Sequence, residues 1–441
     1  MRILQAVQAL PPDTYGGSEL YTERLAEAFA ARGHEVGVAT PRGAGADLDG
    51  VDVYDLPERD APGVQDDRGV PLGPVAPDVD ARFDDLLAAV DPDVVHLQHL
   101  KGLSATIPSL CAARGVTCLL TLHDFWTLCH REQLYRPDGS RCVGPESTAK
   151  CTDCYLADRP FSRIDSADES ADPGERRADG GALPVGESSP SSRRDGSGDA
   201  PREFYADAVA ARQRALGRSI EAVDRLISPS AFLRERFVAF GVPPAHVVRR
   251  RNGIPVDRFA DTGFDGPPVR IGYAGRIAPE KGVHLLLAAF SRLTGDATLE
   301  VFGRFDPEGD DYHARLAAAA GDDVSFHGWY DDPAAPYRAV DVFVLPSVWY
   351  ENSPLVIQEA HASGVPVVTA DVGGMAELVT DGVDGVTFAV GDADALADAL
   401  APLVADPGRV ERLRAGVREP KRLADHADDL LTVYADCLAD G

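Results

Sequence analysis

The stretch DVFVLPSVWYENSPLVIQEAHASGVPVVTA, residues 341–370, contains a complete strand, helix and strand pattern. The run DVFVLPS is apolar enough for a buried strand that ends at Ser347. Pro354 suits the first turn of the following helix, because its nitrogen has no hydrogen to leave unpaired. The helix is expected to end at Gly364, and VPVVTA then has the composition of a second strand. This segment therefore predicts a βαβ unit with parallel strands.

The same alternation extends over most of the chain in two series of apolar strands separated by helical patterns. The first series contains RILQAV, EVGVAT, DVVHLQ and CLLTL, and the second contains VRIGYAG, TLEVFG, DVSFHG, DVFVLP, VPVVTA and GVTFAV. A chain of 441 residues is long enough for more than one core. The sequence predicts an α/β protein with two doubly wound, Rossmann-like domains that face each other across a cleft.

The boundaries of these domains follow from changes in composition. We expect an N-terminal domain over residues 1–157 and 202–240, and a C-terminal domain over 241–406. Residues 158–201 are acidic and rich in Gly, Ser and Pro, so they cannot bury enough apolar surface to fold and are expected to be disordered. Residues 407–441 are predicted to form terminal helices that pack across both domains.

The charge of the chain is strongly negative, with 71 Asp and Glu against 43 Lys and Arg, a formal net charge of −28. High ionic strength would screen the self-repulsion of such a surface, so we expect a halophilic, haloarchaeal-like protein. The same charge argues against nucleic acid as a partner. No stretch approaches 18 consecutive apolar residues and the start lacks a signal-peptide pattern, which favours a cytoplasmic location.

Two glutamates flank the helix of the opening segment. Glu351 lies in the loop before it, and Glu359 lies about two turns along. The backbone N–H groups around Ser353, Leu355 and Val356 are expected to be unpaired and available to an anion. The alternative is that Glu351 interacts only with the helix N-terminus while Glu359 faces solvent.

Two further loops follow predicted strands, where ligands bind in open parallel sheets. Gly16 and Gly17 would let a phosphate or sugar approach the backbone, although a turn without a ligand would have the same composition. In GYAGRIAPEKG, Arg276 and Lys281 would form a clamp for a diphosphate, the alternative being a solvated basic loop. His123 in TLHDFW also follows a strand and would bind a sugar hydroxyl or serve a structural purpose.

Taken together, these motifs resemble the retaining, GT-B-fold glycosyltransferases of family four, the glycosyltransferase group 1 type. The motifs that carry the resemblance occur in the family's order: YGGSE, the histidine of TLHDFW, SPSAFL, NGIPVDRF, GR and EKG, ENSPLVIQE, ASGVPVV and GGMAEL. The resemblance covers most of the chain apart from residues 158–201 and the cysteine-rich stretch before them.

The resemblance implies a role for each matching residue. Arg276 and Lys281 would hold the diphosphate of a nucleotide sugar, Glu359 would accept hydrogen bonds from the ribose, and Glu351 would contact the transferred sugar. Gly17 would lie beside the phosphates, and His123 would contact the sugar from the N-terminal domain. The N-terminal domain would thus lie on the acceptor side, and the C-terminal domain would bind the nucleotide sugar. No metal would be required for transfer, and the leaving phosphate itself would accept the proton of the acceptor. Glu351 and His123 are therefore the residues expected nearest the chemistry.

A cluster of cysteines follows the histidine motif. Cys129, Cys142, Cys151 and Cys154 fall within 26 residues, and the last two form a C-x2-C pair. Four reduced thiols suit a structural zinc site. The spacers of 12 and 8 residues differ from those of a standard finger, so clustered free cysteines are the alternative.

The leading hypothesis is transfer of a sugar from a nucleotide-diphosphate donor to a glycan or lipid-linked acceptor in cell-surface glycan biosynthesis. The alternatives are a nucleotide-sugar epimerase or sugar-phosphate synthase on the same fold, and a non-catalytic sugar- or nucleotide-binding assembly subunit. The basic run at residues 249–251 would suit a lipid-phosphate acceptor, and hence peripheral contact with the inner face of the membrane; otherwise it is a solvated strand edge.

Overall fold

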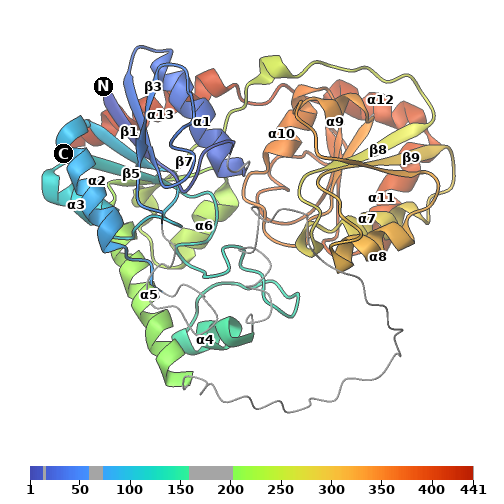
Figure 1. Ribbon diagram of the computed structural model, residues 1–441. Coiled ribbons are helices and arrows are strands. Elements are labelled where there is room, and N and C mark those ends of the chain that lie inside the picture. The colour runs from blue at the N-terminus through green and yellow to red at the C-terminus, as the bar shows by residue number, and fades with distance from the viewer. Residues whose placement is uncertain (13–15, 59–72, 158–201, 441) are drawn as a thin grey trace, which may run out of the picture.

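The computed structural model describes residues 1–12, 16–58, 73–157 and 202–440, and these form two α/β domains that lie side by side (Figure 1). The predicted fold class is confirmed, because each domain is built on its own parallel sheet. The predicted insertion at 158–201 lies outside the described residues, as do residues 13–15, 59–72 and 441.

The N-terminal domain contains seven parallel strands in the order β3-β2-β1-β4-β5-β6-β7. Their bounds are β1 Arg2–Ala6, β2 Glu35–Thr40, β3 Val51–Asp55, β4 Val94–Leu97, β5 Thr117–Thr121, β6 Arg225–Ser228 and β7 Val247–Arg249. Its helices are α1 Gly17–Ala30, α2 Pro77–Val90, α3 Ile107–Arg114, α4 Thr148–Ala157, α5 Arg202–Ala222 and α6 Ala231–Ala239, with the short η1 Pro244–His246. In the centre of the sheet, β1 pairs with β2 and β4, so that Ile3 lies between Val36 and Val94.

The C-terminal domain contains six parallel strands in the order β10-β9-β8-β11-β12-β13. Their bounds are β8 Val269–Ala274, β9 Ala297–Phe302, β10 Val324–Gly328, β11 Val342–Leu345, β12 Val367–Ala370 and β13 Gly385–Phe388. Its helices are η2 Val256–Arg258, η3 Pro279–Lys281, α7 Val283–Phe290, α8 Asp311–Ala319, α9 Ala335–Arg338, α10 Leu355–Ala362 and α11 Ala393–Ala405.

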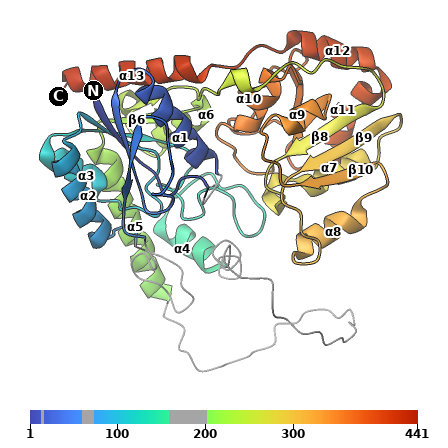
Figure 2. The same cartoon turned by 45° about the horizontal axis from the view of Figure 1, so that its top comes forward.

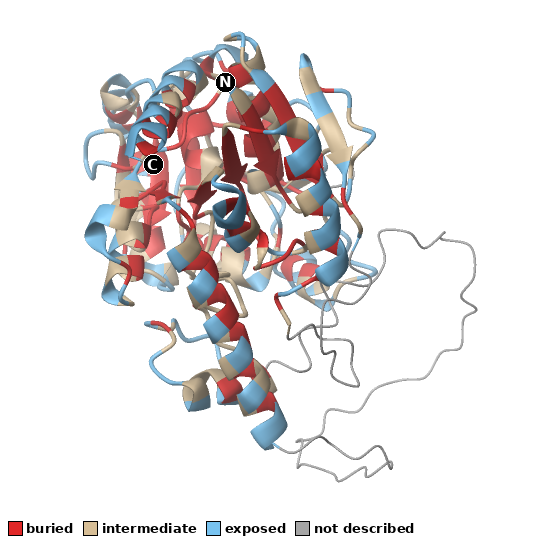
Figure 3. Ribbon diagram, turned by 90° about the vertical axis from the view of Figure 1, so that its left-hand side faces the viewer, coloured by how far each residue is buried: buried red, intermediate tan, exposed pale blue. Residues whose placement is uncertain are grey.

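The βαβ prediction for residues 341–370 is confirmed by β11, α10 and β12, whose strands are hydrogen-bonded neighbours. The strand ends at Leu345 rather than at the predicted Ser347, and helix α10 stops before Gly364, whose φ of +68° favours glycine. All four residues of β11 and of β12 are buried, because helices cover both faces of a parallel sheet. Figure 3 shows this arrangement for the N-terminal domain, with buried strands inside helices whose outer faces are exposed.

The predicted boundary at residue 240 is too early. Strand β7 lies within the range assigned to the C-terminal domain, but it pairs with β6 and completes the first sheet. The pairing of Ile227 with Val248 decides this, since a three-residue strand has no periodicity that the sequence could reveal.

The last two helices divide between the domains (Figure 2). Helix α12, Pro407–Gly416, packs through Val410 and Leu413 into the core of the C-terminal domain. The chain then returns beside Ile254, and α13, Leu423–Asp440, packs against the core of the N-terminal domain.

Candidate active site at the domain junction

Two loops at the carboxyl end of the C-terminal sheet are fitted tightly together. Gly282 has a φ of +75°, and a Cβ at this position would lie 2.1 Å from the carbonyl oxygen of Pro346, so only glycine fits. The N–H of Val348 donates to the carbonyl oxygen of Glu280 at 3.0 Å. This close approach places Lys281, at the end of η3, beside the loop that carries Glu351.

Lys281 and Glu351 form an ion pair in this position. The Nζ of Lys281 lies 2.6 Å from Oε1 of Glu351, and the hydroxyl of Ser347 donates to the same oxygen at 2.8 Å. The two side chains are only 20% and 11% exposed, so salt screens the pair less than a surface pair. The Nζ also lies 5.0 Å from the ring centroid of Trp349. The structure thus brings together two of the predicted site residues.

The start of helix α10 is open to a ligand. Its N-cap is Pro354, and no side chain caps it, so the N–H groups of Leu355 and Val356 in the first turn lack an intrahelical acceptor. Nearby, Asn352 Oδ1 and Ser353 Oγ are buried and have no hydrogen-bond partner among the described residues. Buried polar atoms are normally paired, so these atoms mark a place for a polar ligand.

Glu359 lies in helix α10 and is 9% exposed, which excludes the alternative that it faces solvent. The hydroxyl of Tyr337 donates to its Oε2 at 2.8 Å, and Nη1 of Arg24 lies 3.9 Å from its Oε1. Burial raises the pKa of the Glu359 carboxyl above its ordinary value, while Arg24 and Tyr337 counteract that rise. Arg24 comes from α1, so this carboxylate faces a cation of the other domain.

Arg276 does not join the Lys281 and Glu351 pair. Its side chain is 53% exposed, and its guanidinium lies 2.5 Å from a carboxylate oxygen of Glu280. The predicted clamp therefore consists of one cation that is enclosed in the site and one that is half exposed beside it.

His123 follows β5, and its neighbour Gln98 follows β4 in the same sheet. The ring Nε2 of His123 donates to Oε1 of Gln98 at 3.2 Å, and the amide nitrogen of Gln98 donates to Gln5 and His96. Burial, together with the charge of His99, lowers the pKa of His123 to about 3, so the imidazole is neutral. Its Nδ1 is then free of a proton and can accept a hydrogen bond.

The two halves of the site are joined directly. The side-chain amide of Asn352 donates to the carbonyl oxygen of His123 at 3.0 Å. Gly374 makes room for this loop, because a Cβ there would lie 1.8 Å from the carbonyl oxygen of Asn352. The residues expected nearest the chemistry, Glu351 and His123, therefore belong to segments in contact across the junction.

The glycine loop lies at the start of α1. Gly16 is the N-cap, and the carboxylate of Glu19 occupies the space beside it, whereas a Cβ at Gly17 would meet nothing within 4 Å. Gly17 therefore leaves the space that an approaching ligand requires, and Gly16 does not.

The basic run of residues 249–251 lies at a second contact between the domains. Glu377 accepts hydrogen bonds from the N–H groups of Ala231 and Phe232, at the start of α6, at 2.8 and 2.5 Å. Arg249 lies 3.2 Å from the same carboxylate, and Arg251 donates to the backbone oxygen of Glu377. Two of the three arginines thus connect the domains.

In the described part of the chain, no helix is long and apolar enough to cross a membrane.

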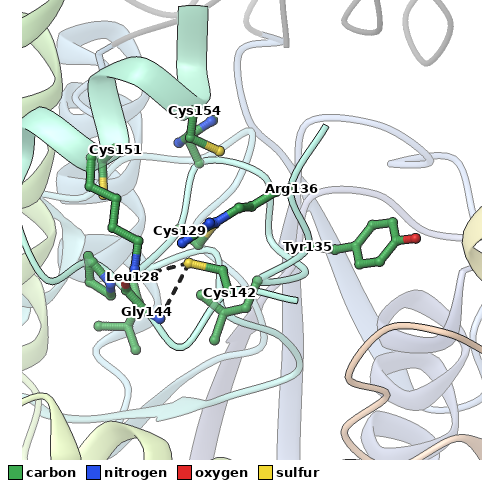
Figure 4. Close-up of a pocket in the computed structure, with 12 residues that line it drawn as sticks. Leu128, Cys129, Tyr135, Arg136, Cys142, Gly144, Cys151 and Cys154 are labelled. Carbon is green, nitrogen blue, oxygen red and sulfur yellow. Dashed lines mark hydrogen bonds between the residues drawn. The ribbon is translucent and has the colours of Figure 1, made fainter. Parts of the chain in front are cut away.

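The four clustered cysteines line a single pocket together with Arg136 and Lys150 (Figure 4). Burial raises the pKa of the Cys129 and Cys151 thiols to about 11. With the cysteine side chains in these rotamers, no group of three or more His, Cys, Asp or Glu residues in the described segments is arranged to hold a metal ion.

Three contributors to the site were not predicted from the sequence: Arg24, Gln98 and Asn352. Gln98 had a usable signal, since it comes directly after the strand DVVHL at the carboxyl edge of the sheet. Arg24 and Asn352 act across the domain junction, and no local pattern marks such contacts.

A junction between two doubly wound domains, with charged loops at the carboxyl end of one sheet, is the arrangement of the GT-B class. The family model described as "Glycosyl transferases group 1" matches residues 268–406, and the model "Glycosyltransferase Family 4" matches residues 15–143. Each domain therefore matches a glycosyltransferase family model over most of its length.

Curated relatives carry related names. The GDP-mannose-dependent alpha-mannosyltransferase of Mycobacterium tuberculosis is 36% identical over 193 residues, which are 41% of this chain and 48% of that protein. The D-inositol 3-phosphate glycosyltransferase of Kribbella flavida is 34% identical over 218 residues, 44% of this chain and 51% of that protein. The matched region spans about half the length of these relatives.

Solved structures share the fold over nearly the whole chain. HepE of Anabaena, in complex with UDP and glucose, has a TM-score of 0.64 at 17% identity and covers 99% of this chain and 100% of its own. A sucrose-phosphate synthase of Thermosynechococcus elongatus has a TM-score of 0.65 at 20% identity, with 100% of both chains covered. At these identities the likeness concerns the fold.

Proposed function

We propose that the protein transfers a sugar, with retention of configuration, from a nucleotide-diphosphate donor to a glycan or lipid-linked acceptor. The observation that carries this proposal is the enclosed ion pair of Lys281 and Glu351 at the uncapped start of α10, with Glu359 buried further along the same helix. Lys281 and the free N–H groups would suit a diphosphate. The carboxylates of Glu351 and Glu359 would suit the sugar on one side of the diphosphate and the ribose on the other.

The departing nucleoside diphosphate gains negative charge as the glycosidic bond breaks. Lys281 and the N–H groups of Leu355 and Val356 would stabilise that charge in the transition state, and Arg276 would turn inward from the rim to reach it. Glu359 would accept hydrogen bonds from the ribose, and Gly17 would lie beside the phosphates. Glu351 would bind hydroxyls of the transferred sugar from one side while His123 binds it from the other.

The way in which Glu351 is held supports retention. Its carboxylate is paired with Lys281 and accepts a hydrogen bond from Ser347, an environment suited to binding hydroxyls rather than to attack on carbon. The acceptor hydroxyl would instead attack from the face that the phosphate leaves. The carbon–phosphate oxygen bond breaks, the new carbon–oxygen bond forms on the same face, and the leaving phosphate takes the proton of the acceptor.

The names of the relatives support the class of donor. The mannosyltransferase is named for GDP-mannose and HepE is bound to UDP, so a nucleoside diphosphate is common to both. A relative from Rhizobium meliloti is named as a lipopolysaccharide core glycosyltransferase, which favours a cell-surface glycan as the acceptor here.

Calorimetric titration with a panel of nucleotide sugars tests the donor, followed by product analysis with and without an acceptor. Binding of at least one nucleoside-diphosphate sugar and an anomeric configuration that is retained in the product are expected. Failure of every donor to bind would refute the proposal. A donor converted without any acceptor would instead indicate an epimerase, and binding without turnover would indicate an assembly subunit.

The net charge of −28 further supports a halophilic protein that acts in the cytoplasm. We expect its Tm to rise with molar KCl, and a Tm independent of salt would contradict this adaptation.

A further inference from the structure

Four thiols from three separate segments surround the pocket of Figure 4. Cys129 follows the TLHDFW loop, Cys142 ends a hairpin, and Cys151 and Cys154 lie one turn apart on α4. The N–H of Cys142 donates to the carbonyl oxygen of Leu134 at 2.6 Å, which fixes the first two segments against each other. Residues up to 25 positions apart in sequence are thus gathered at one place by tertiary structure.

The backbone turns toward two of these sulfurs. The N–H of Gly144 donates to Sγ of Cys142 at 3.4 Å, and the N–H groups of Arg131 and Leu134 face Sγ of Cys129. In both cases one donor comes from the residue two positions after the cysteine. A neutral thiol is a weak acceptor, whereas a thiolate gains from such donors. The turns have unusual backbone angles, with φ of +65° at Glu132 and +134° at Gly144.

Positive charge also surrounds the pocket. Arg136 and Lys150 line it, and the Nζ of Lys150 donates to the carbonyl oxygen of Gly144 at 3.0 Å. Arg212, 8% exposed, stacks on Trp126 at 4.8 Å and donates to its carbonyl oxygen. A divalent metal with four thiolates carries two negative charges, which these cations would offset.

We infer that Cys129, Cys142, Cys151 and Cys154 bind one Zn²⁺ ion as four thiolates. Each thiol gives up its proton, so binding of one Zn²⁺ releases four protons and forms four zinc–sulfur bonds without any change of oxidation state. In their present rotamers the four sulfurs do not converge on one point. Binding therefore requires the cysteine side chains to rotate about χ1, which is the torsion that sets the position of the sulfur.

The metal would fix a hairpin at the domain junction. This hairpin lies between Cys129 and Cys142 and is closed by an antiparallel bridge of Tyr135 with Arg141. At the start of the hairpin, the Nζ of Lys101 lies 2.6 Å from a carboxylate oxygen of Glu132. Tyr135 points away from the thiols toward the C-terminal domain in Figure 4. Burial, together with the charge of Glu280, raises the pKa of its hydroxyl. Zinc would therefore hold Tyr135 beside the loop that precedes Lys281.

Elemental analysis of the full chain, purified without chelators, tests this inference independently of any transfer activity. We expect one zinc per chain in the natural protein and in Cys437→Ser, whose thiol is buried on α13 outside the cluster. The double variant Cys151→Ser, Cys154→Ser should lose the metal.

Cobalt uptake by the chelator-treated natural protein provides a second measurement, which stands even if the double variant fails to fold. Thiolate-to-cobalt absorption in the near ultraviolet and the visible bands of a tetrahedral site are expected. A folded protein that contains no zinc and takes up no cobalt would overturn the inference, as would zinc that persists in the double variant. Iron in place of zinc would overturn the identity of the metal.

Discussion

The two domains present different chemistry at the carboxyl ends of their sheets. In the C-terminal domain the groups at this edge are charged and paired, as in Lys281 with Glu351 and Arg276 with Glu280. In the N-terminal domain the His123 side chain is neutral, since burial holds the pKa of its ring near 3 and its Nε2 donates to Gln98. The charged groups beside it are paired with each other, as in His99 with Asp124 at 3.0 Å. Charge suits phosphates and a neutral acceptor suits hydroxyls, so under the proposed function the C-terminal domain would bind the phosphates of the donor and His123 would bind hydroxyls of its sugar.

The largest effect is expected from Lys281→Ala. It removes the enclosed cation and leaves the Glu351 carboxylate unpaired, a loss that costs roughly 3–5 kcal/mol for a buried pair. Calorimetry should show donor affinity falling by roughly 100-fold or more. Lys101→Ala is the matched control, because Lys101 forms a pair of the same 2.6 Å length with Glu132 in the other domain. Equal losses in both variants would remove the distinction between the domains.

Glu359→Gln should weaken donor binding by roughly 10- to 100-fold, because it replaces a charge-assisted hydrogen bond to the ribose. Burial raises the pKa of this carboxyl, so it becomes protonated as pH falls while still above the ordinary 4.5. Donor affinity should therefore begin to fall above pH 4.5 in the natural protein, and this fall should be absent in the variant. Inorganic pyrophosphate has no ribose, so its affinity should be the same in both proteins.

His123→Ala should lower kcat roughly 10-fold, the value of one or two hydrogen bonds to the sugar, and leave the affinity for the free nucleoside diphosphate unchanged. Steady-state kinetics and calorimetry together separate these two quantities. His327→Ala is the control, because this histidine pairs with Glu300 at the far edge of the C-terminal sheet. A loss of nucleotide affinity in His123→Ala would show that the N-terminal domain also binds the phosphates.

The smallest effect is expected from Glu377→Gln at the contact between the domains. Its carboxylate accepts two backbone hydrogen bonds at the start of α6, and the uncharged amide can replace only part of this interaction. Tm should fall by about 2–4 °C, the shift that corresponds to about 1 kcal/mol in a domain of this size. Calorimetric unfolding measures the shift, and an unchanged Tm would show that the contact does not stabilise the junction.

The two domains also differed in how far the sequence predicted them. Strands such as β11 and β12 were predicted because they are continuous apolar runs beside proline and glycine signals. The short strand β7 was not predicted, since a strand of three residues is too short to show a periodic pattern. The same reasoning also did not predict that the last two helices pack against different domains. The pairing of Lys281 with Glu351 was not predicted either, although both residues were expected in the site.

The sequence by itself determined the fold class and indicated most residues of the candidate site, because periodic burial, helix-start signals and strand-end loops are local properties of the chain. Only the tertiary structure decided the pairings: Lys281 with Glu351, Arg24 with Glu359, Asn352 with the carbonyl of His123, and four cysteines around one pocket. These contacts join residues as much as 335 positions apart, as in Arg24 and Glu359. No local preference specifies such contacts, which arise only when the sheets and the junction between them have formed.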